Sequence, residues 1–174
     1  MLDLKVSKID AAKRQLETAI RLYFNDADPV SIHTLTGAAH KILSDLNKKV
    51  AGPPMLTNDA IIKEEYKKEF WQKINEARNH FKHADNDSEA VIDFNPEINE
   101  ILIYDACMKY EQLTGEFVPY VRIFGGWFVS GHLDFFMSDP KFTEFIKIRQ
   151  KYKHKSEFFS AMLSVSGYLQ PTKI

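Results

Sequence analysis

The sequence contains only one cysteine, Cys107, among its 174 residues. No intrachain disulfide can form, which excludes the small, disulfide-stapled scaffolds common among secreted proteins. Cys107 lies in the apolar run at 101–108, so we expect a buried structural thiol rather than a nucleophile. The opening residues, Met-Leu-Asp-Leu-Lys, lack the basic stretch and apolar region of a secretory leader, and we therefore expect a cytoplasmic protein.

The chain also lacks a long uninterrupted apolar run. The nearest approach is the aromatic segment at 117–137, which Pro119, Arg122, His132 and Asp134 interrupt and which a Gly-Gly pair at 125–126 divides. A bilayer-spanning helix needs about 20 consecutive, predominantly apolar residues. We expect no membrane association, and we interpret the segment as a buried, bent helix or helix pair. Its aromatic residues contribute first to the core and second to a ligand pocket, and a dimer interface is a further alternative.

An excess of charge of one sign is absent, since the formal net charge is −1. This near-neutral balance argues against an obligate nucleic-acid binder. The charge is unevenly placed, however: residues 85–116 hold nine acids against Lys109, whereas residues 141–155 hold six Lys or Arg against Glu144. These segments are either two solvated faces, complementary within the fold or across a dimer, or the basic one contacts a phosphate backbone.

Hydrophobic residues make up 44% of the chain and aromatic residues 13%, which indicates a folded core. We expect an all-α, single-domain bundle of about six helices spanning residues 1–174, with the first three helices at about 7–84 and the aromatic and basic C-terminal helices at about 95–166. Three dipeptides, Asp28-Pro29, Asn95-Pro96 and Asp139-Pro140, each predict a helix start.

Apolar residues that recur every three or four positions place the individual helices. A short, extended piece is expected at 91–94. The predicted helices run from about Ser7 to Phe24, from Pro29 to about Val50, from Thr57 or Asn58 to Phe81, from Pro96 to near Gly115, through the segment from Phe117, from Pro140 to about Lys153, and from near Glu157 to Ser166.

One hexapeptide, Arg78-Asn79-His80-Phe81-Lys82-His83, combines a fixed cation, an amide and two imidazoles near a helix C-terminus. Its arginine, polar residue, three further positions and histidine resemble the signature of the HEPN superfamily of small all-α domains, many of which are metal-independent RNases that act as dimers. The resemblance implies that Arg78 holds a phosphate, that His83 transfers a proton during attack by the ribose 2′-hydroxyl, and that Asn79 orients one of them, with no cofactor. Residues 77–85 and 28–35 are also similar to a group of uncharacterised bacterial all-helical proteins.

Helical geometry constrains this site. At 100° per residue, Arg78 and His83 lie about 140° apart around the helix axis, too far for both to contact one phosphate. Either the helix ends before His83, or Arg78 of one protomer meets His83 of a second across a two-fold axis. The second arrangement predicts a homodimer that binds RNA or a nucleotide phosphate.

Two other interpretations of the same residues stay open. In the first, His80, Lys82 and His83 interact with the helix dipole and Arg78 pairs with an acid such as Glu76, so that the protein is a non-catalytic module that binds a protein partner or scaffolds a dimer. In the second, weaker one, Glu76, His80 and His83 bind a metal, joined by His33 and His40. Without cysteine ligands or a known metal motif, we expect no metal. The spacing of the hexapeptide recurs at Arg149-Gln150-Lys151-Tyr152-Lys153-His154.

Overall fold

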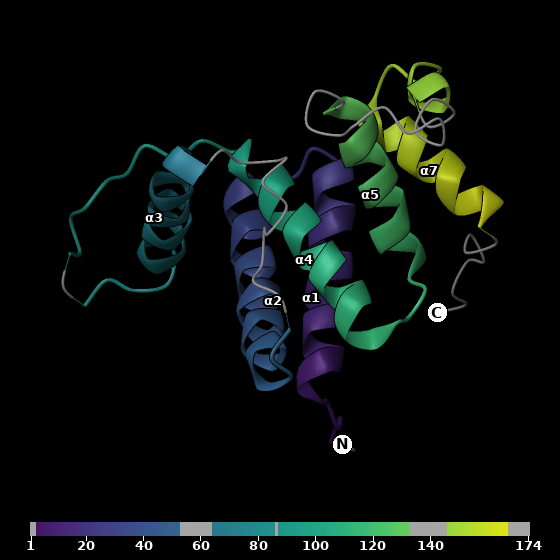
Figure 1. The fold of residues 1–174 in the computed structure, drawn as a ribbon. Helices are drawn as coiled ribbons and strands as arrows, with labels where there is room; N and C mark the ends of the chain where they lie inside the picture. The colour runs from purple at the N-terminus through teal and green to yellow at the C-terminus, as the bar shows by residue number, and fades with distance from the viewer. Residues whose placement is uncertain (1–2, 53–63, 86, 133–145, 167–174) are drawn as a thin grey trace.

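The computed structural model describes residues 3–52, 64–85, 87–132 and 146–166, and within these ranges all regular structure is helical. The predicted all-α class is confirmed. A short helical stretch also occupies 146–149. The longer helices, drawn in Figure 1, are α1 (Lys8–Phe24), α2 (Pro29–Lys49), α3 (Glu64–His80), α4 (Ile98–Thr114), α5 (Pro119–Gly131) and α7 (Lys155–Val165).

The helix ends follow from local chemistry. Ser7 and Asp10 form a reciprocal capping box at the start of α1. The Asp28 carboxylate accepts a hydrogen bond from the Ser31 N–H (2.7 Å), and proline follows it at the first helical position of α2. Helix α4 ends at Gly115, whose φ of +63° is left-handed and favours glycine. The sequence therefore predicted the ends of these helices to within one or two residues.

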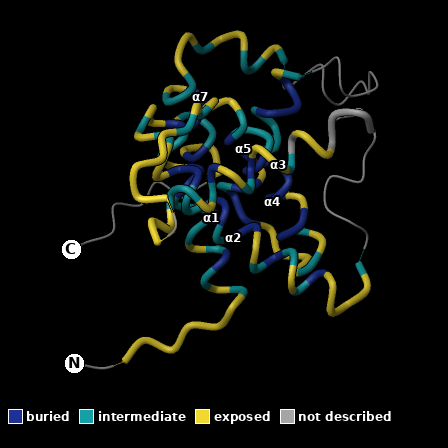
Figure 2. The backbone as a smooth tube through the Cα atoms, turned by 90° about the vertical axis from the view of Figure 1, so that its left-hand side faces the viewer, coloured by how far each residue is buried: buried dark blue, intermediate teal, exposed yellow. Residues whose placement is uncertain are grey.

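Helices α1, α2, α4 and α5 pack together, and α7 covers α5 and α1 (Figure 1). The buried residues gather where these helices meet, as the dark blue tube of Figure 2 shows. Helix α3 stands to one side of α2 and touches the rest of the fold at fewer positions. It buries Ile74 and Ala77 against its neighbours.

Aromatic rings fill the core between α1, α5 and α7. Phe24 is fully buried at the end of α1 and stacks on Phe159, with ring centroids 4.5 Å apart. Phe124, Trp127 and Phe158 surround it at 5.7–6.3 Å. Most of the apolar side chains of α5 are therefore buried inside this chain, and the dimer interface expected for the segment stays a prediction.

Several predicted details differ from the structure. Helix α5 continues through Gly125 and Gly126, so of the two expected arrangements the described residues form a single helix there and not a helix pair. Residues 91–94 pair with no strand in the described chain. The basic segment leaves its helix at 149 rather than near Lys153, because a turn precedes α7. The start of the third helix near Thr57, and the Asp139-Pro140 dipeptide, lie outside the described residues. Within the described ranges, no helix combines the length and apolar character needed to cross a bilayer.

Phe24→Ala should destabilise the protein strongly, because removing a fully buried ring leaves a cavity among four other rings. We expect the free energy of unfolding to fall by about 3–5 kcal/mol, measured by urea denaturation. Phe117→Ala is the matched control: that ring is 67% exposed and lies over Arg122, so the loss should be below about 1 kcal/mol. Equal losses for the two variants would contradict this account of the core.

Candidate functional site

Arg78 lies in the last turn of α3 and is directed toward α2. Its aliphatic stem rests on Gly37, where an added β-carbon would lie 3.5 Å from Cγ and Cδ of Arg78. Ile74, one turn earlier on α3, faces the same way and is buried. The apolar contact of Ile74 thus holds α3 against α2 and places the arginine between the two helices.

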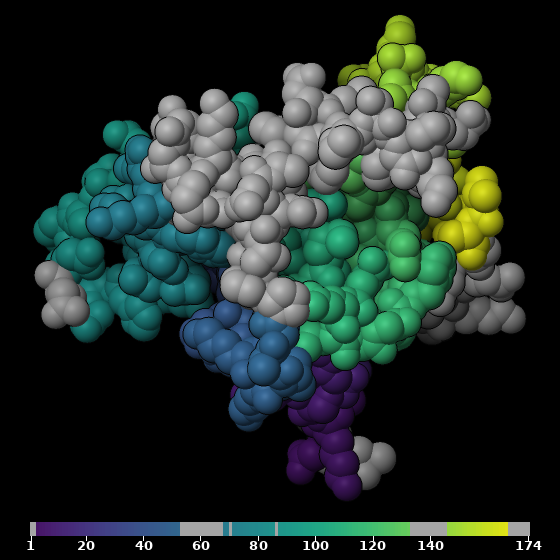
Figure 3. All heavy atoms as spheres, viewed as in Figure 1, coloured from purple at the N-terminus to yellow at the C-terminus, as the bar shows by residue number. Residues whose placement is uncertain are grey.

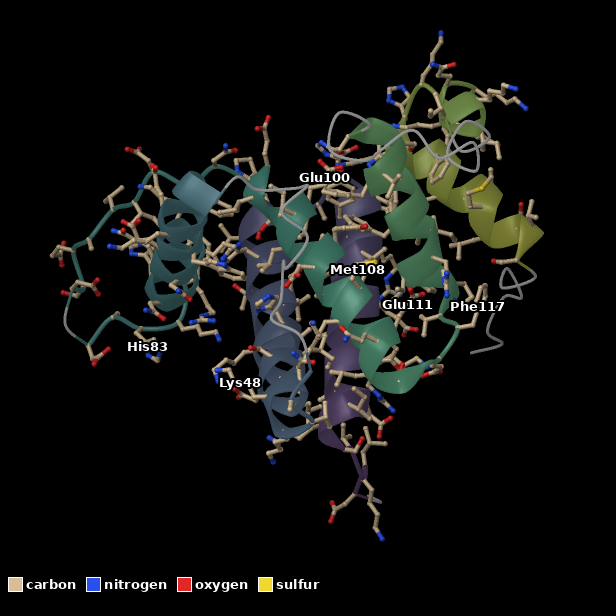
Figure 4. The ribbon with its side chains drawn as sticks, viewed as in Figure 1. Lys48, His83, Glu100, Met108, Glu111 and Phe117 are labelled. Atoms are coloured by element: carbon tan, nitrogen blue, oxygen red, sulfur yellow. The ribbon has the colours of Figure 1, made fainter. Side chains whose placement is uncertain are left out.

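A cavity of about 510 Å3 lies between α2 and α3 beside Arg78. We call it the Arg78 pocket. Its lining carries cations, amides, a hydroxyl and an aromatic ring. The residues that line it are His40, Lys41, Ser44, Asn47, Lys48, Gly52, Trp71, Asn75 and Arg78. Figure 4 shows Lys48 on the side of α2 that faces α3.

The Arg78 pocket is basic. Its described lining contains Lys41, Lys48 and Arg78 but no carboxylate. Lys41 binds Asp45 on the exposed side of α2, at 2.6 Å. Among the described residues, no acceptor group receives a hydrogen bond from the Arg78 guanidinium, and Glu76 pairs instead with Lys73 at 3.5 Å. Arg78 therefore does not pair with Glu76 among the described residues, while the non-catalytic interpretation as a whole stays a prediction.

A buried imidazole and carboxylate lie behind the pocket. His40 donates from Nε2 to Oδ2 of Asp105 on α4 (2.8 Å), and both side chains are at most 7% exposed. The ring of Trp71 lies 5.4 Å from the His40 ring, tilted by 44°. These contacts fix the inner wall of the pocket and connect it to α4.

A second buried polar pair lies two turns earlier on α2. His33 donates from Nδ1 to Oδ1 of Asn99 (2.9 Å), and the Asn99 amide donates to the Pro29 carbonyl (3.0 Å). The rings of Phe81 and Phe94 meet His33 edge-on at 5.6 and 5.2 Å. Burial lowers the pKa of His33, and the charge of Arg78 lowers it further. The hydrogen bond to Asn99 acts in the opposite direction, but burial has the larger effect.

His83 lies on the other side of the α3 end. Helix α3 ends at His80, before His83, and the His83 backbone N–H bonds to the Asn79 carbonyl (3.0 Å) in the turn that follows. Asn79, His80 and His83 line a separate cavity together with Glu76, Asp85 and Asp87. We call it the His83 pocket. Figure 4 shows His83 beyond the end of α3, away from α2.

Within one chain, the structure brings Asn79 and His83 together but places Arg78 in a different pocket. The angular separation calculated from the sequence explains this arrangement. Acids surround His83, whereas cations surround Arg78, so the two pockets also differ in the sign of the charge that they favour. A composite site in which Arg78 meets His83 of a second protomer stays a prediction.

The weaker metal interpretation finds no support in the described residues, which contain no group of three or more His, Cys, Asp or Glu side chains placed to share an ion. His33 and His40, the two additional candidates, are held by Asn99 and Asp105 on the opposite side of α2 from solvent. Cys107 is buried, and burial raises the pKa of its thiol well above the usual range. It is a structural thiol, as predicted.

The second occurrence of the arginine-to-histidine spacing has a structural role. The Arg149 guanidinium lies 4.0 Å from the centroid of the Trp127 ring and donates to the Trp127 carbonyl (3.2 Å). A β-carbon at Gly131 would overlap the end of the Arg149 side chain as it lies here. His154 is the exposed N-cap residue of α7. The contacts between Arg149 and Trp127 therefore hold the basic segment against α5.

Sequence reasoning missed the Asp105 carboxylate and gave Trp71 only a packing role. The sequence did contain a signal for Asp105. A single acid inside the apolar run at 101–108 must have a buried partner, and histidine, as at His40, is a residue type that can provide one. Trp71 and Asn75 gave no such signal, because their role depends on how α3 lies against α2. Comparisons with protein-family models, with curated proteins and with solved structures give no match to this chain.

His33 should make the stability of the fold depend on pH. Its pKa is lowered in the folded state, so the unfolded chain binds more protons below about pH 6.5, and the free energy of unfolding should fall as the pH falls from that value. His33→Gln should reduce this slope by up to about 1.4 kcal/mol per pH unit. Urea denaturation between pH 5 and 8 is the measurement.

The matched control is His154→Gln, which changes an exposed histidine with no side-chain cap bond. Its pH dependence should follow that of the parent. If the free energy of unfolding of His33→Gln changed with pH as steeply as that of the parent, His33 would take up protons as readily in the folded chain as in the unfolded chain.

Proposed function

We propose that this chain is an RNA-binding helical protein in which the Arg78 pocket holds a nucleotide phosphate. The observation that carries the proposal is Arg78 itself: a partly buried guanidinium, braced on Gly37, with no acidic partner among the described residues and two lysines beside it. A cation fixed in this way is ready to bind an anion, because little side-chain freedom is left to lose.

The chemistry of the lining favours a nucleotide over a simple anion. A guanidinium can donate two parallel hydrogen bonds to a phosphate, and Lys48 supplies a second charge. The Asn75 amide in the lining offers a donor and an acceptor for the edge of a base. The volume of about 510 Å3 leaves room for a nucleotide beside these groups.

RNA cleavage is the second candidate function, and it requires two protomers. His83 is exposed at the end of α3, so a second copy can reach it. The HEPN-like assignment then places Arg78 of one chain on the phosphate and the partner's imidazole at the 2′-hydroxyl. One chain alone cannot carry out this chemistry, because its own Arg78 and His83 occupy pockets on different sides of α3.

Arg78→Ala should weaken binding of a labelled single-stranded RNA of about ten nucleotides by roughly 10- to 100-fold, since charge-assisted hydrogen bonds contribute about 1.5–3 kcal/mol. Arg78→Lys should lie between parent and Ala, because it keeps the charge and loses the paired donors. Fluorescence anisotropy at low and moderate salt measures the dissociation constants. Competition by AMP and by inorganic phosphate distinguishes a nucleotide site from a phosphate site.

The matched control is Arg14→Ala, which removes an exposed arginine from α1 and the same formal charge. Its affinity should stay within about twofold of the parent affinity. Equal affinity of Arg78→Ala and the parent would exclude the pocket as the binding site. If Arg14→Ala weakened RNA binding as much as Arg78→Ala does, the effect would come from the change of net charge and not from the pocket.

Mixing two inactive variants tests the dimeric cleavage site. If the site is composite, Arg78→Ala and His83→Ala should each abolish cleavage, and an equimolar mixture should recover about a quarter of the parent activity, because half of the dimers regain one of their two sites. His154→Ala should cleave as the parent does. No recovery on mixing, or a sedimentation-equilibrium mass of one chain at tens of micromolar, would exclude the composite site.

A further inference from the structure

Helix α3 has a second face that the Arg78 pocket does not use. A cavity of about 520 Å3 lies on that side, between α3, the segment at 92–95 and the start of α4. We call it the acidic cleft. Four exposed acids stand around it: Glu69 and Glu76 from α3, Asp93 from the connecting segment and Glu97 at the N-cap of α4. Lys73 is the only cation in its described lining, and it already pairs with Glu76.

The floor of the acidic cleft is apolar, formed by Ala77, Ile92, Phe94, Ile98 and Ile101. This floor is rigid, because Phe94 packs edge-on against Phe81 at 5.1 Å and against His33 at 5.2 Å. The acids of the cleft continue toward the His83 pocket, which shares Glu76 and Ile92 and adds Asp85 and Asp87. An apolar floor with a rim of one charge indicates a ligand that is apolar in the middle and oppositely charged on both sides.

We propose that the acidic cleft docks a cationic segment of a partner protein, with one bulky apolar side chain on the floor and lysine or arginine residues on each side of it. Charge complementarity selects this occupant. The sign excludes RNA at this face, because the four acids would repel its phosphates. The acidic cleft and the Arg78 pocket share no lining residue, so an experiment can contradict one proposal and leave the other standing.

A second copy of this chain does not fit the cleft as well. Its own basic segment offers Lys147, Lys151 and Lys153, but the apolar residues between them, Ile148 and Tyr152, pack on the core of their own chain. The described stretch from Lys147 to Lys153 therefore has charge without a free apolar side chain. Figure 3 places residues 146–155 at the upper right of the molecule and the teal residues of α3 and its following segment at the left. No ion pair among the described residues joins the two segments.

The experiment uses a labelled peptide with a central leucine and two lysines on each side, titrated with the full chain and followed by anisotropy. We expect binding that weakens as salt is added. A peptide with serine in place of leucine should bind at least about tenfold more weakly, and one with glutamates in place of the lysines should not bind. Equal binding of the leucine and serine peptides would overturn the proposal, since the apolar floor would then have no part in it.

Two double variants with the same change of net charge locate the site. Glu76→Gln with Glu97→Gln should weaken peptide binding by at least about tenfold, whereas Glu89→Gln with Asp3→Asn, exposed acids outside the cleft, should change it by less than about twofold. Ile92→Ser, checked by thermal melting, should also weaken binding. Equal effects of the two double variants would overturn the proposal. So would self-association of the parent that the Glu76 and Glu97 changes abolish, because the occupant would then be a second copy.

Discussion

The two buried polar pairs between α2 and α4 are the contacts on which both sites depend. Each places a histidine of α2 on a polar residue of α4: His33 on Asn99 and His40 on Asp105. A buried polar group that loses its partner costs about 1–3 kcal/mol, so only one register of the two helices satisfies both pairs. That register fixes the position of the start of α4, and the first turn of α4 forms one wall of the acidic cleft. The same register fixes the His40 imidazole, which forms the inner wall of the Arg78 pocket.

Helix α3 separates two surfaces of opposite charge. Its Arg78 face meets the lysines of α2, and its Glu69 and Glu76 face meets the acids of the following segment and of α4. The aromatic cluster of His33, Phe81 and Phe94 lies at the junction and holds the helix end and the connecting segment together. An anionic and a cationic ligand can therefore approach the same helix from different sides without competing for the same side chains.

Local signals in the sequence predicted the fold well where a helix has a defined cap. Ser7, Asp28 and Gly115 mark helix ends because their side chains or backbone conformations satisfy groups that a helix leaves free. At Gly125 and Gly126 the sequence left a single helix and a helix pair open, and the structure has the single helix, because glycine weakens a helix by only about 1 kcal/mol per residue and the core contacts of Phe124 and Phe128 outweigh that. The angle between Arg78 and His83 was also available from the sequence. The partners of Arg78 were not, since Gly37, Lys48 and Trp71 come together only through the packing of α3 on α2.

The sparse attachment of α3 has a consequence for how the two faces communicate. Among its described side chains, only Ile74 and Ala77 are buried apolar residues, so we expect local opening of this helix to require less free energy than opening of α1, α2 or α4. Opening removes a wall from both cavities at once. A ligand that binds on either side stabilises the closed helix and so prepares the other side, and thermodynamic reciprocity makes the two affinities rise by the same factor. The Arg78 pocket and the acidic cleft would then be positively coupled. The coupling would act through the order of helix α3, although neither site contacts the ligand of the other.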